Sequence, residues 1–418
     1  MSQSNYQDLQ DKSKKHWEEL TNGAVPLIRI GSAMCGHASG AFRISNKFKS
    51  LIDDKSLEVN LNHVGCLGLC YAEPIVEVKK ENYPRVFFRN VSEDDVEEII
   101  NSYIIGDTIP DVGILGFLGN EDINLPAPSL DEIPGISLQK RIALRNAGHI
   151  DPSDVLQYIA NDGYSGLHKA LTSMEPSDVI DEVKNSGLRG RGGAAFSTGL
   201  KWSFMVNSPG PTKYILCNCE EGDPGAYNDK GILESDPYTL IEGLTIAGYA
   251  TGASNGIVFI RHGHDGPIDR TEQAISQAYE YGLLGKNIFG SDFSFDIEVS
   301  LTGESYVAGE ETALMEAVEG KRSMPRYRPP FPAAYGVWGK PSTINNVKSL
   351  SYAPEIISKG SEWFSKIGVE KSTGTAIVCL SGEINNPGLY EVPMGMTLGQ
   401  VIDDLGGGIS KNRTLKLL

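Results

Sequence analysis

The chain has 418 residues, a formal net charge of −17, 40% hydrophobic residues and six cysteines. Its length suits two or three domains, and an acidic balance argues against a non-specific nucleic-acid binder. The sequence has neither a run of roughly 18 to 20 apolar residues nor the apolar centre of a signal peptide. Together with the sparse cysteines, this predicts a cytoplasmic protein with reduced thiols and no transmembrane segment.

The first third of the chain predicts a thioredoxin-like domain over residues 1–105. Residues 1–20 are polar and predict a helical lead-in or a solvated arm, of which the arm is favoured. The elements expected after it are a buried strand over 25–32, a loop that opens a helix, a strand from Glu58, a hairpin of 74–80 and 84–90, and a helix capped by Ser92. This order of strands and helices is typical of the thioredoxin-like fold.

The remaining segments differ in composition. Residues 106–137 are rich in proline and glycine and lack a period, which predicts a linker or strap. Helices and β-rich runs alternate over 138–370, which predicts a Rossmann-like α/β domain. Residues 371–418 predict two strands, a turn at 386–388 and a helix capped by Thr397, typical of a partial β-grasp module. The sequence ends in an apolar run, 416–418, where a further strand is expected to begin.

The densest motif is GLRGRGGAAFSTGLKW, from Gly187 to Trp202, with five glycines, two arginines and one lysine. Glycine lets backbone N–H groups approach a phosphate, and a helix N-terminus after the loop favours an anion. Lys201 is positioned in sequence to supply a counter-charge. The spacing is neither G-x-G-x-x-G nor Walker A. A phosphate-binding loop is therefore predicted, and a glycine-rich turn with surface arginines is the alternative.

Together with three later blocks, this loop resembles the NADH-binding flavoprotein (FMN) subunit family of respiratory complex I. The family includes the diaphorase subunits of NAD-linked hydrogenases and formate dehydrogenases. The later blocks are CNCEEGDPGAYNDKGILESDPYTLIEG from Cys217, GESYVAGEETALMEAVEGKR from Gly303 and RPPFPAAYGVWGKPSTINNVKSL from Arg328. The resemblance covers about residues 138–418, with the β-grasp part similar to an SLBB module, and more loosely the first 100.

The resemblance implies roles for individual positions. It places FMN against Gly190, Arg191, Gly192, Gly193, Lys201, Asn218, Glu220, Glu221, Tyr306, Gly309, Glu310, Glu311, Asn345 and Asn346. It places NADH against Phe196, Phe204, Asp223, Arg328 and Phe331. Hydride transfer needs no protein acid or base, so Glu310 and Glu311, the nearest to catalytic residues, are expected to orient the substrate or tune the flavin. Their alternative reading is as carboxylates that stabilise a helix start.

Three cysteines are candidate metal ligands. A thioredoxin-like [2Fe–2S] domain carries C-x4-C and C-x3-C, and Cys66 and Cys70 match the second half. Cys35 matches the second cysteine of the first half, but Ile30 stands where the first belongs. A bound [2Fe–2S] cluster with an incomplete ligand set is slightly favoured, with Ser32 or His37 as candidates to complete it. Loss of the cluster is the rival reading.

The resemblance implies an FMN-dependent NAD(H) oxidoreductase, or diaphorase, subunit. Relatives continue into a [4Fe–4S] motif that this sequence lacks, because Cys379 is its only cysteine after Cys219. Expected partners are therefore other subunits that carry iron–sulfur clusters and the terminal catalytic site, with residues 373–418 buried against one of them or against a continuation. The alternatives are a cofactor-depleted scaffold subunit and a thioredoxin-like carrier. The terminal acceptor and the choice between NAD and NADP stay open.

Overall fold

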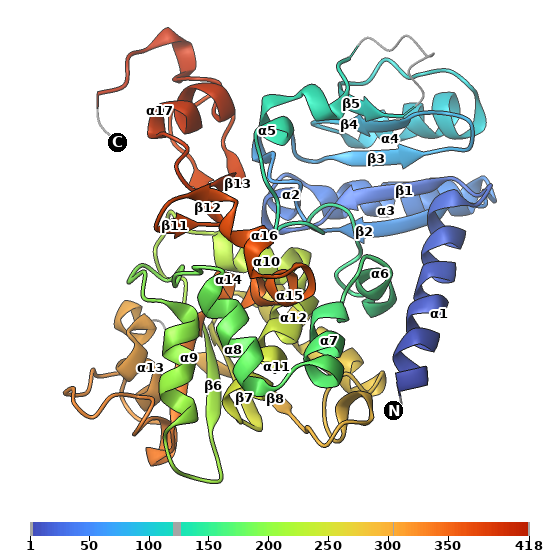
Figure 1. The fold of residues 1–418 in the computed structure, drawn as a ribbon. Helices are drawn as coiled ribbons and strands as arrows, with labels where there is room; N and C mark the ends of the chain where they lie inside the picture. The colour runs from blue at the N-terminus through green and yellow to red at the C-terminus, as the bar shows by residue number, and fades with distance from the viewer. Residues whose placement is uncertain (1–2, 120–126, 304, 417–418) are drawn as a thin grey trace.

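The computed structural model describes residues 3–119, 127–303 and 305–416. Two β-sheets with their helices form the upper and lower parts of the molecule, and a smaller C-terminal module lies beside the upper one (Figure 1). Among the described residues, no helix has the length and apolar character needed to cross a membrane. The fold is mixed α/β, as the sequence predicts.

The N-terminal sheet has five strands in the order β2-β1-β3-β4-β5. Its strands are β1 (Leu27–Gly31), β2 (Asn60–Val64), β3 (Val76–Lys79), β4 (Arg85–Phe88) and β5 (Ile114–Leu118). The strands β1 and β2 are parallel and the other pairs are antiparallel. Its helices are α2 (Met34–Ala38), α3 (Ala41–Asp54) and α4 (Glu93–Glu98), the last continued by a π-helical stretch, Ile99–Ile105. The predicted strands, hairpin and Ser92 cap are all present, the cap as a capping box with Asp95.

Two segments differ from the expectation. The strap over 106–137 contributes β5, which pairs with β4 and completes the sheet; its residues 120–126 lie outside the described ranges. The N-terminal segment is not a solvated arm, since it forms α1 (Gln3–Asn22). Tyr6 and Leu9 of α1 are buried in the hydrophobic core of the large domain. A few apolar side chains spaced along one face thus anchor a mostly polar helix. The predicted domain boundaries remain predictions.

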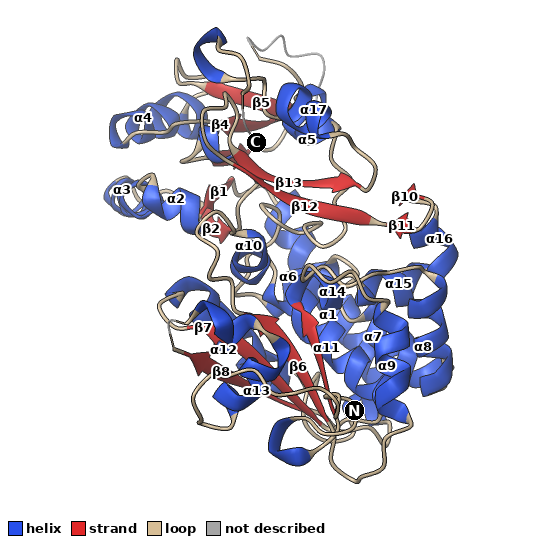
Figure 2. Ribbon diagram, turned by 90° about the vertical axis from the view of Figure 1, so that its left-hand side faces the viewer, coloured by secondary structure: helices blue, strands red, loops and turns tan. Residues whose placement is uncertain are grey.

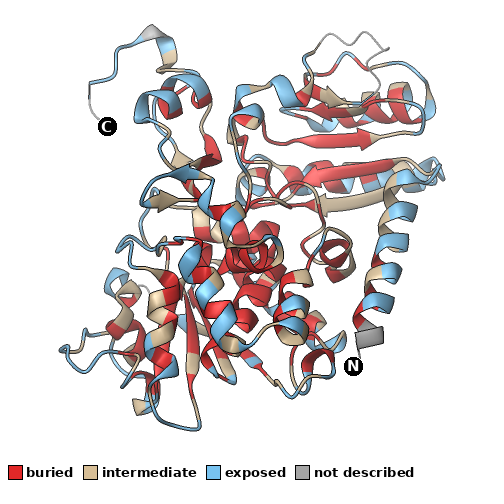
Figure 3. Ribbon diagram, viewed as in Figure 1, coloured by how far each residue is buried: buried red, intermediate tan, exposed pale blue. Residues whose placement is uncertain are grey.

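The large domain is built on a parallel four-stranded sheet in the order β8-β7-β6-β9. Its strands are β6 (Tyr214–Cys219), β7 (Asn255–Arg261), β8 (Asp296–Thr302) and β9 (Ser342–Asn346). The central strands β6 and β7 are buried over most of their length because helices cover both faces of the sheet (Figures 2 and 3). The helices are α6 (Val155–Ala160), α7 (Ser165–Ser173), α8 (Pro176–Asn185), α9 (Thr198–Val206), α10 (Asn228–Ser235), α11 (Pro237–Thr251), α12 (Asp265–Glu280), α13 (Glu311–Val318), α14 (Val347–Ser351), α15 (Ala353–Lys359) and α16 (Ser361–Ser365). The short helix α5 (Pro134–Ser137) instead packs between the N-terminal sheet and the C-terminal module.

The C-terminal module consists of short elements. They are β10 (Gly368–Val369), β11 (Ser372–Thr373), β12 (Thr375–Leu380), β13 (Gly388–Pro393) and α17 (Leu398–Gln400). The strands β12 and β13 form the predicted antiparallel pair, and Thr397 caps α17 as predicted. Glu391 of β13 is fully buried and accepts backbone hydrogen bonds from Ile142 and Leu144 at 2.8 and 2.9 Å, which anchors the module to the large domain. Of the expected terminal strand, Leu417 and Leu418 lie outside the described residues, and Lys416 is in no strand.

Candidate functional site

The strand order of the parallel sheet creates a crevice between β6 and β9. The chain runs from β6 outward to β7 and β8 and then returns to the other side of β6 as β9. Connections therefore leave these two neighbouring strands on opposite faces, and such a switch point is where open α/β sheets bind ligands. Asn218 and Asn346 lie opposite each other in register at the carboxyl ends of the two strands.

A cavity of about 470 Å³ opens at this crevice. Its size falls within the usual range for small-molecule and cofactor sites. It is lined by Arg191, Gly192, Asn218, Glu220, Glu221, Gly222, Asp223, Ala226, Asn228, Asp229, Tyr306, Val307, Gly309, Glu310, Asn346 and Lys348. Nine of the predicted FMN residues and Asp223 are thus brought to one place from four separate sequence blocks.

The glycine loop contributes backbone to the wall of the cavity. The loop closes on itself, because Gly190 donates a hydrogen bond to the carbonyl of Phe196 at 2.7 Å. A Cβ added at Gly192 would lie 3.1 Å from Cβ of Asn346, so the loop backbone packs directly against the end of β9. Gly193 has φ of +109°, a conformation that favours glycine. These positions leave the main chain open to a ligand.

Arg191 holds the loop in place through its side chain. Its guanidinium donates to the carbonyls of Thr373 and Thr375 at 2.7 and 3.0 Å, and its backbone N–H donates to Oγ of Ser349 at 2.9 Å. The arginine therefore connects the glycine loop to the C-terminal module. The positively charged guanidinium lies against these carbonyl oxygens at the edge of the cavity.

Lys201 lies in an ion-pair cluster beside the cavity and is not among the residues that line it. Its Nζ is 3.1 Å from Oε2 of Glu311, whose other oxygen is 2.5 Å from Nη1 of Arg328. Glu310 accepts hydrogen bonds from the backbone of Thr312 at 2.9 Å and so caps α13. The helix-start reading is therefore confirmed for Glu310, although this residue also lines the cavity.

The acidic turn after β6 is held by internal hydrogen bonds. Asn218 donates from Nδ2 to the carbonyl of Gly309 at 2.8 Å, which ties β6 to the 3-10 turn Tyr306–Gly309. Glu220 pairs with Arg261 at 2.6 Å and is nearly buried. Glu221 accepts three backbone hydrogen bonds from the first residues of α10, at 2.9 to 3.0 Å. Burial, followed by the neighbouring Asp229, raises the pKa of Glu221.

Three polar residues that line the cavity, Asn228, Asp229 and Lys348, were not predicted from the sequence. Lys348 is buried and lies 3.0 Å from Oδ1 of Asp229, while Asn346 donates to Oδ2 of Asp229 at 2.5 Å. The sequence gives no signal for this role, because it depends on the burial of Lys348 beside Asp229. Asn345 faces elsewhere: Trp202 donates to its Oδ1 at 3.3 Å, and its buried Nδ2 has no hydrogen-bond partner among the described residues.

The predicted nucleotide residues include three exposed aromatic rings. Phe196, Phe204 and Phe331 are 47%, 50% and 60% exposed, although phenylalanine side chains are normally buried. The rings of Phe196 and Phe204 have centroids 6.1 Å apart. Exposed aromatic side chains are suited to stack on a planar ligand, although none of these three rings lines the cavity itself.

The three predicted metal ligands lie together in the N-terminal domain. Sγ of Cys35 is 3.1 Å from Sγ of Cys70, and Cys66 lies in the same loop as Cys70. Over the described ranges, no group of three or more His, Cys, Asp or Glu side chains is arranged to hold a metal ion. Ile30 is fully buried in β1. The [2Fe–2S] cluster therefore stays a prediction, with three thiols together and an alkyl group at the fourth position. Cys219, beside the cavity, is buried, and burial raises its pKa.

Comparison with known proteins is consistent with this site. The Nuo51 FMN-binding domain family matches residues 183–355, and the SLBB domain family matches residues 377–415. HndC, a component of the NADP-reducing hydrogenase of Solidesulfovibrio fructosivorans, is 50% identical over 278 residues, which are 66% of this chain and 56% of that protein. A component of the NADH-quinone oxidoreductase of Rhizobium meliloti is 45% identical over 275 residues, 66% of this chain and 65% of that protein.

A solved structure extends the likeness to most of the fold. The NAD+-reducing [NiFe]-hydrogenase in the H2-reduced state superposes with a TM-score of 0.56 at 25% identity, covering 91% of this chain and 60% of that chain. The matched region thus spans between about half and two thirds of these relatives.

Proposed function

We propose that this chain, a member of the Nuo51 flavoprotein family, binds FMN in the cavity between β6 and β9 and exchanges hydride with NAD(H). In this proposal it acts as the diaphorase subunit of a larger complex and passes electrons singly to iron–sulfur clusters. The observation that carries the proposal is the convergence of the glycine loop, the acidic turn, the 3-10 turn and the end of β9 on one cavity of about 470 Å³.

The residues present fit a flavin mononucleotide. Gly192 offers main chain where a Cβ would already meet Asn346, which suits the close approach of a phosphate or ribityl chain. The amides of Asn218 and Asn346 supply donors and acceptors at the strand ends. Lys348 supplies a buried cation that its neighbours Asp229 and Asn228 hold in place. The donor set is therefore that expected for a polar, anionic cofactor.

When bound, FMN supplies a ring that accepts a hydride and releases electrons one at a time. The protein's own task is to position and to shield. The hydrogen bond from Asn218 to Gly309 fixes the 3-10 turn that carries Tyr306 against the cavity. Glu310 and Glu311 hold Arg328 near the same edge, at 3.7 and 2.5 Å, and so place a cation where a dinucleotide phosphate would arrive. Neither carboxylate needs to move a proton for this role.

The exposed aromatic rings suggest where the rest of NADH binds. Phe196 belongs to the glycine loop and Phe204 to α9, so both are fixed relative to the cavity by the same segment. Phe331 and Arg328 come from the block before β9. We infer that adenine stacks on this aromatic group while the nicotinamide reaches into the cavity. In this proposal, the residues at this edge determine whether the site accepts NAD(H) or NADP(H), which differ by one phosphate.

The partners are inferred from electron flow. A reduced flavin can hand on single electrons, which suits an iron–sulfur cluster as the next carrier, and relatives of this chain are named as subunits of an NADP-reducing hydrogenase and of an NADH-quinone oxidoreductase. We propose that other subunits supply that cluster and the terminal catalytic site, and that the complex is cytoplasmic. The SLBB domain, which packs on the glycine loop through Arg191, lies between the cavity and such a partner in this proposal.

The test is flavin binding and electron transfer by the purified full chain. We expect one FMN per chain after reconstitution, and rapid reduction of ferricyanide by NADH that depends on that FMN. NADPH in place of NADH measures the nucleotide preference. A folded chain that takes up no FMN at micromolar concentration would refute the proposal and favour the scaffold alternative.

A further inference from the structure

Cys35 and Cys70 form a pair whose geometry suits a different chemistry from the one the sequence pattern predicts. Cys35 lies in α2 and Cys70 begins the 3-10 turn Cys70–Ala72. Their sulfur atoms are 3.1 Å apart, and both residues are partly exposed. Closing this gap to a disulfide requires each sulfur to move by about half an ångström, since an S–S bond is about 2.05 Å long.

The ligand set for an iron–sulfur cluster is incomplete here. Ile30 stands where the pattern requires the fourth cysteine, and its buried alkyl group cannot bind iron.

We propose that Cys35 and Cys70 are a reversible dithiol–disulfide pair that exchanges with low-molecular-weight disulfides. The proposal rests on the N-terminal domain alone and is independent of the flavin site. The thiols of Cys35, in α2, and of Cys70, in the turn that follows β2, are both partly exposed. A small solute can therefore reach them.

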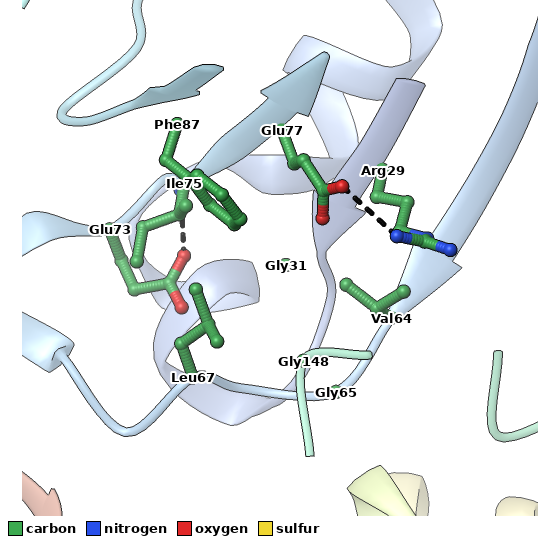
Figure 4. Close-up of a pocket in the computed structure, with 10 residues that line it drawn as sticks. All are labelled: Arg29, Gly31, Val64, Gly65, Leu67, Glu73, Ile75, Glu77, Phe87 and Gly148. Carbon is green, nitrogen blue, oxygen red and sulfur yellow. Dashed lines mark hydrogen bonds and ion pairs between the residues drawn. The ribbon is translucent and has the colours of Figure 1, made fainter. Parts of the chain in front are cut away.

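Cys66 also contacts the thiols of Cys35 and Cys70, but it is the most buried of the three cysteines. It is 8% exposed, and its sulfur accepts a hydrogen bond from the backbone of Gly68 at 3.1 Å. It also lies 3.4 Å from Oε1 of Glu73, whose other oxygen accepts from the backbone of Ile75 (Figure 4). Because Cys66 is buried, a small disulfide reaches its thiol less readily than those of the partly exposed pair.

The remaining cysteines are unsuited for other reasons. Cys217 and Cys219 are fully buried in β6. Cys379 is partly exposed, but its sulfur accepts a hydrogen bond from the backbone of Tyr227 at 3.3 Å. Exchange should therefore be specific for one pair among six cysteines.

The exchange balances in two steps. One sulfur of the pair, as its thiolate, attacks a small disulfide RSSR, forms a mixed disulfide and releases RS⁻. The second thiol loses its proton and attacks the protein sulfur of that mixed disulfide, which forms the Cys35–Cys70 bond and releases a second RS⁻. The protein loses two electrons and two protons, and RSSR becomes two RSH. An excess of RSH reverses both steps.

The test uses the full chain, reduced anaerobically, desalted and then incubated with oxidised glutathione. Free thiols are alkylated, and peptides are identified by mass spectrometry. We expect a cross-linked peptide joining Cys35 and Cys70, loss of two alkylatable thiols, and full recovery of both with reduced glutathione. Cys35→Ser and Cys70→Ser should instead retain one glutathione as a mixed disulfide. Cys66→Ser and Cys379→Ser should form the bond as the wild-type chain does.

Several results would overturn the proposal. A wild-type chain that keeps glutathione without forming the internal bond, or that joins Cys66 to either partner, excludes the pair. So does retention of two irons per chain through gel filtration after anaerobic treatment with iron and sulfide, because that assigns the cysteines to a cluster. Since the decisive measurement is on the wild-type chain, a variant that fails to fold leaves the test intact.

Discussion

The two ends of α10 border sites of opposite character. At its N-terminus, Asn228 and Asp229 line the large cavity, where every sequence block of the flavoprotein pattern is represented. At its C-terminus, Ser235 accepts a hydrogen bond from the backbone of Cys66, in a domain where the expected ligand pattern is broken. The two sites are separated by a helix of eight residues, about 12 Å long.

The difference lies in how each site is built. The cavity is formed by backbone, by carboxylates that cap helices and by buried ion pairs, so its shape is supported by many contacts. A metal site depends on each ligand, and a single change to isoleucine at position 30 removes one quarter of the donors that a [2Fe–2S] cluster requires. Four predictions test how firmly each site is held.

The largest effect is expected from Lys348→Met. It leaves the carboxylate of Asp229 buried with only the amide of Asn346 as a strong partner. Breaking a buried pair on one side costs about 3–5 kcal/mol. We expect the free energy of unfolding of the FMN-free chain to fall by about that amount, measured by urea denaturation, and FMN binding to be lost.

A double variant separates the pair from the rest of the cavity. Lys348→Met with Asp229→Leu should regain most of the stability, because no unpaired charge remains. Lys366→Met removes a solvent-exposed pair with Glu362 and should leave stability nearly unchanged. Equal losses for Lys348→Met and Lys366→Met would show that the cavity does not depend on its buried cation.

Gly192→Val should weaken FMN binding about a hundredfold, equivalent to about 2.7 kcal/mol. The added Cβ would lie 3.1 Å from Asn346, and the branched side chain must either displace that asparagine or enter the cavity. Gly192→Ala should fall between valine and the wild type. The measurement is quenching of flavin fluorescence in a titration, and unchanged affinity in the valine variant would remove the glycine loop from the site.

Glu234 gives a pH-dependent prediction at the other end of α10. Burial raises the pKa of this carboxyl to about 6, with Cys35 adding to the shift while Lys230, Arg270 and a hydrogen bond from the backbone of Met34 oppose it. The folded state therefore holds its proton more tightly than the unfolded chain. Stability falls as pH rises from about 4.5 to about 6, by roughly 2 kcal/mol in total.

The matching variant is Glu234→Gln, which keeps an oxygen for the backbone N–H of Met34. It should be about 2 kcal/mol more stable than the wild type at pH 8 and equal to it at pH 4. Urea denaturation at the two pH values measures this. If the variant is equally stabilised at both pH values, a change in packing, and not the buried charge, explains the effect.

Much of the fold followed from local signals in the sequence. Strands such as β1 and β7 are short hydrophobic runs, and the caps at Ser92 and Thr397 are side-chain chemistry that acts within four residues. The burial of α1 did not follow, because Tyr6 and Leu9 find their partners in α6 and beyond, far away along the chain. β5 was missed for the same reason: its glycine-containing sequence becomes a strand only because β4 offers an edge.

The candidate site shows the same division. The glycine loop and the asparagine at the end of β9 were recognised from their pattern and meet at one cavity. Lys201 was predicted to face the phosphate, but the structure pairs it with Glu311, a residue that no spacing rule connects to it. Lys348 was missed because its function depends on burial beside Asp229. Local sequence patterns do not predict contacts between residues that lie far apart along the chain.

The smallest effect concerns the aromatic group at the mouth of the cavity. Phe196→Ala removes an exposed ring that we propose stacks on adenine, and stacking of a base on an aromatic ring contributes about 1–3 kcal/mol. Because such a contact is equal in the bound substrate and in the transition state, we expect KM for NADH to rise about tenfold with kcat nearly unchanged. Reduced nicotinamide mononucleotide, which lacks adenine, is the matched substrate, and its KM should not respond to the variant. Phe42→Ala, which removes a more exposed ring from α3, should leave both values unchanged. A rise in KM for the mononucleotide as large as that for NADH would assign Phe196 to the support of the glycine loop and leave the adenine without its proposed contact.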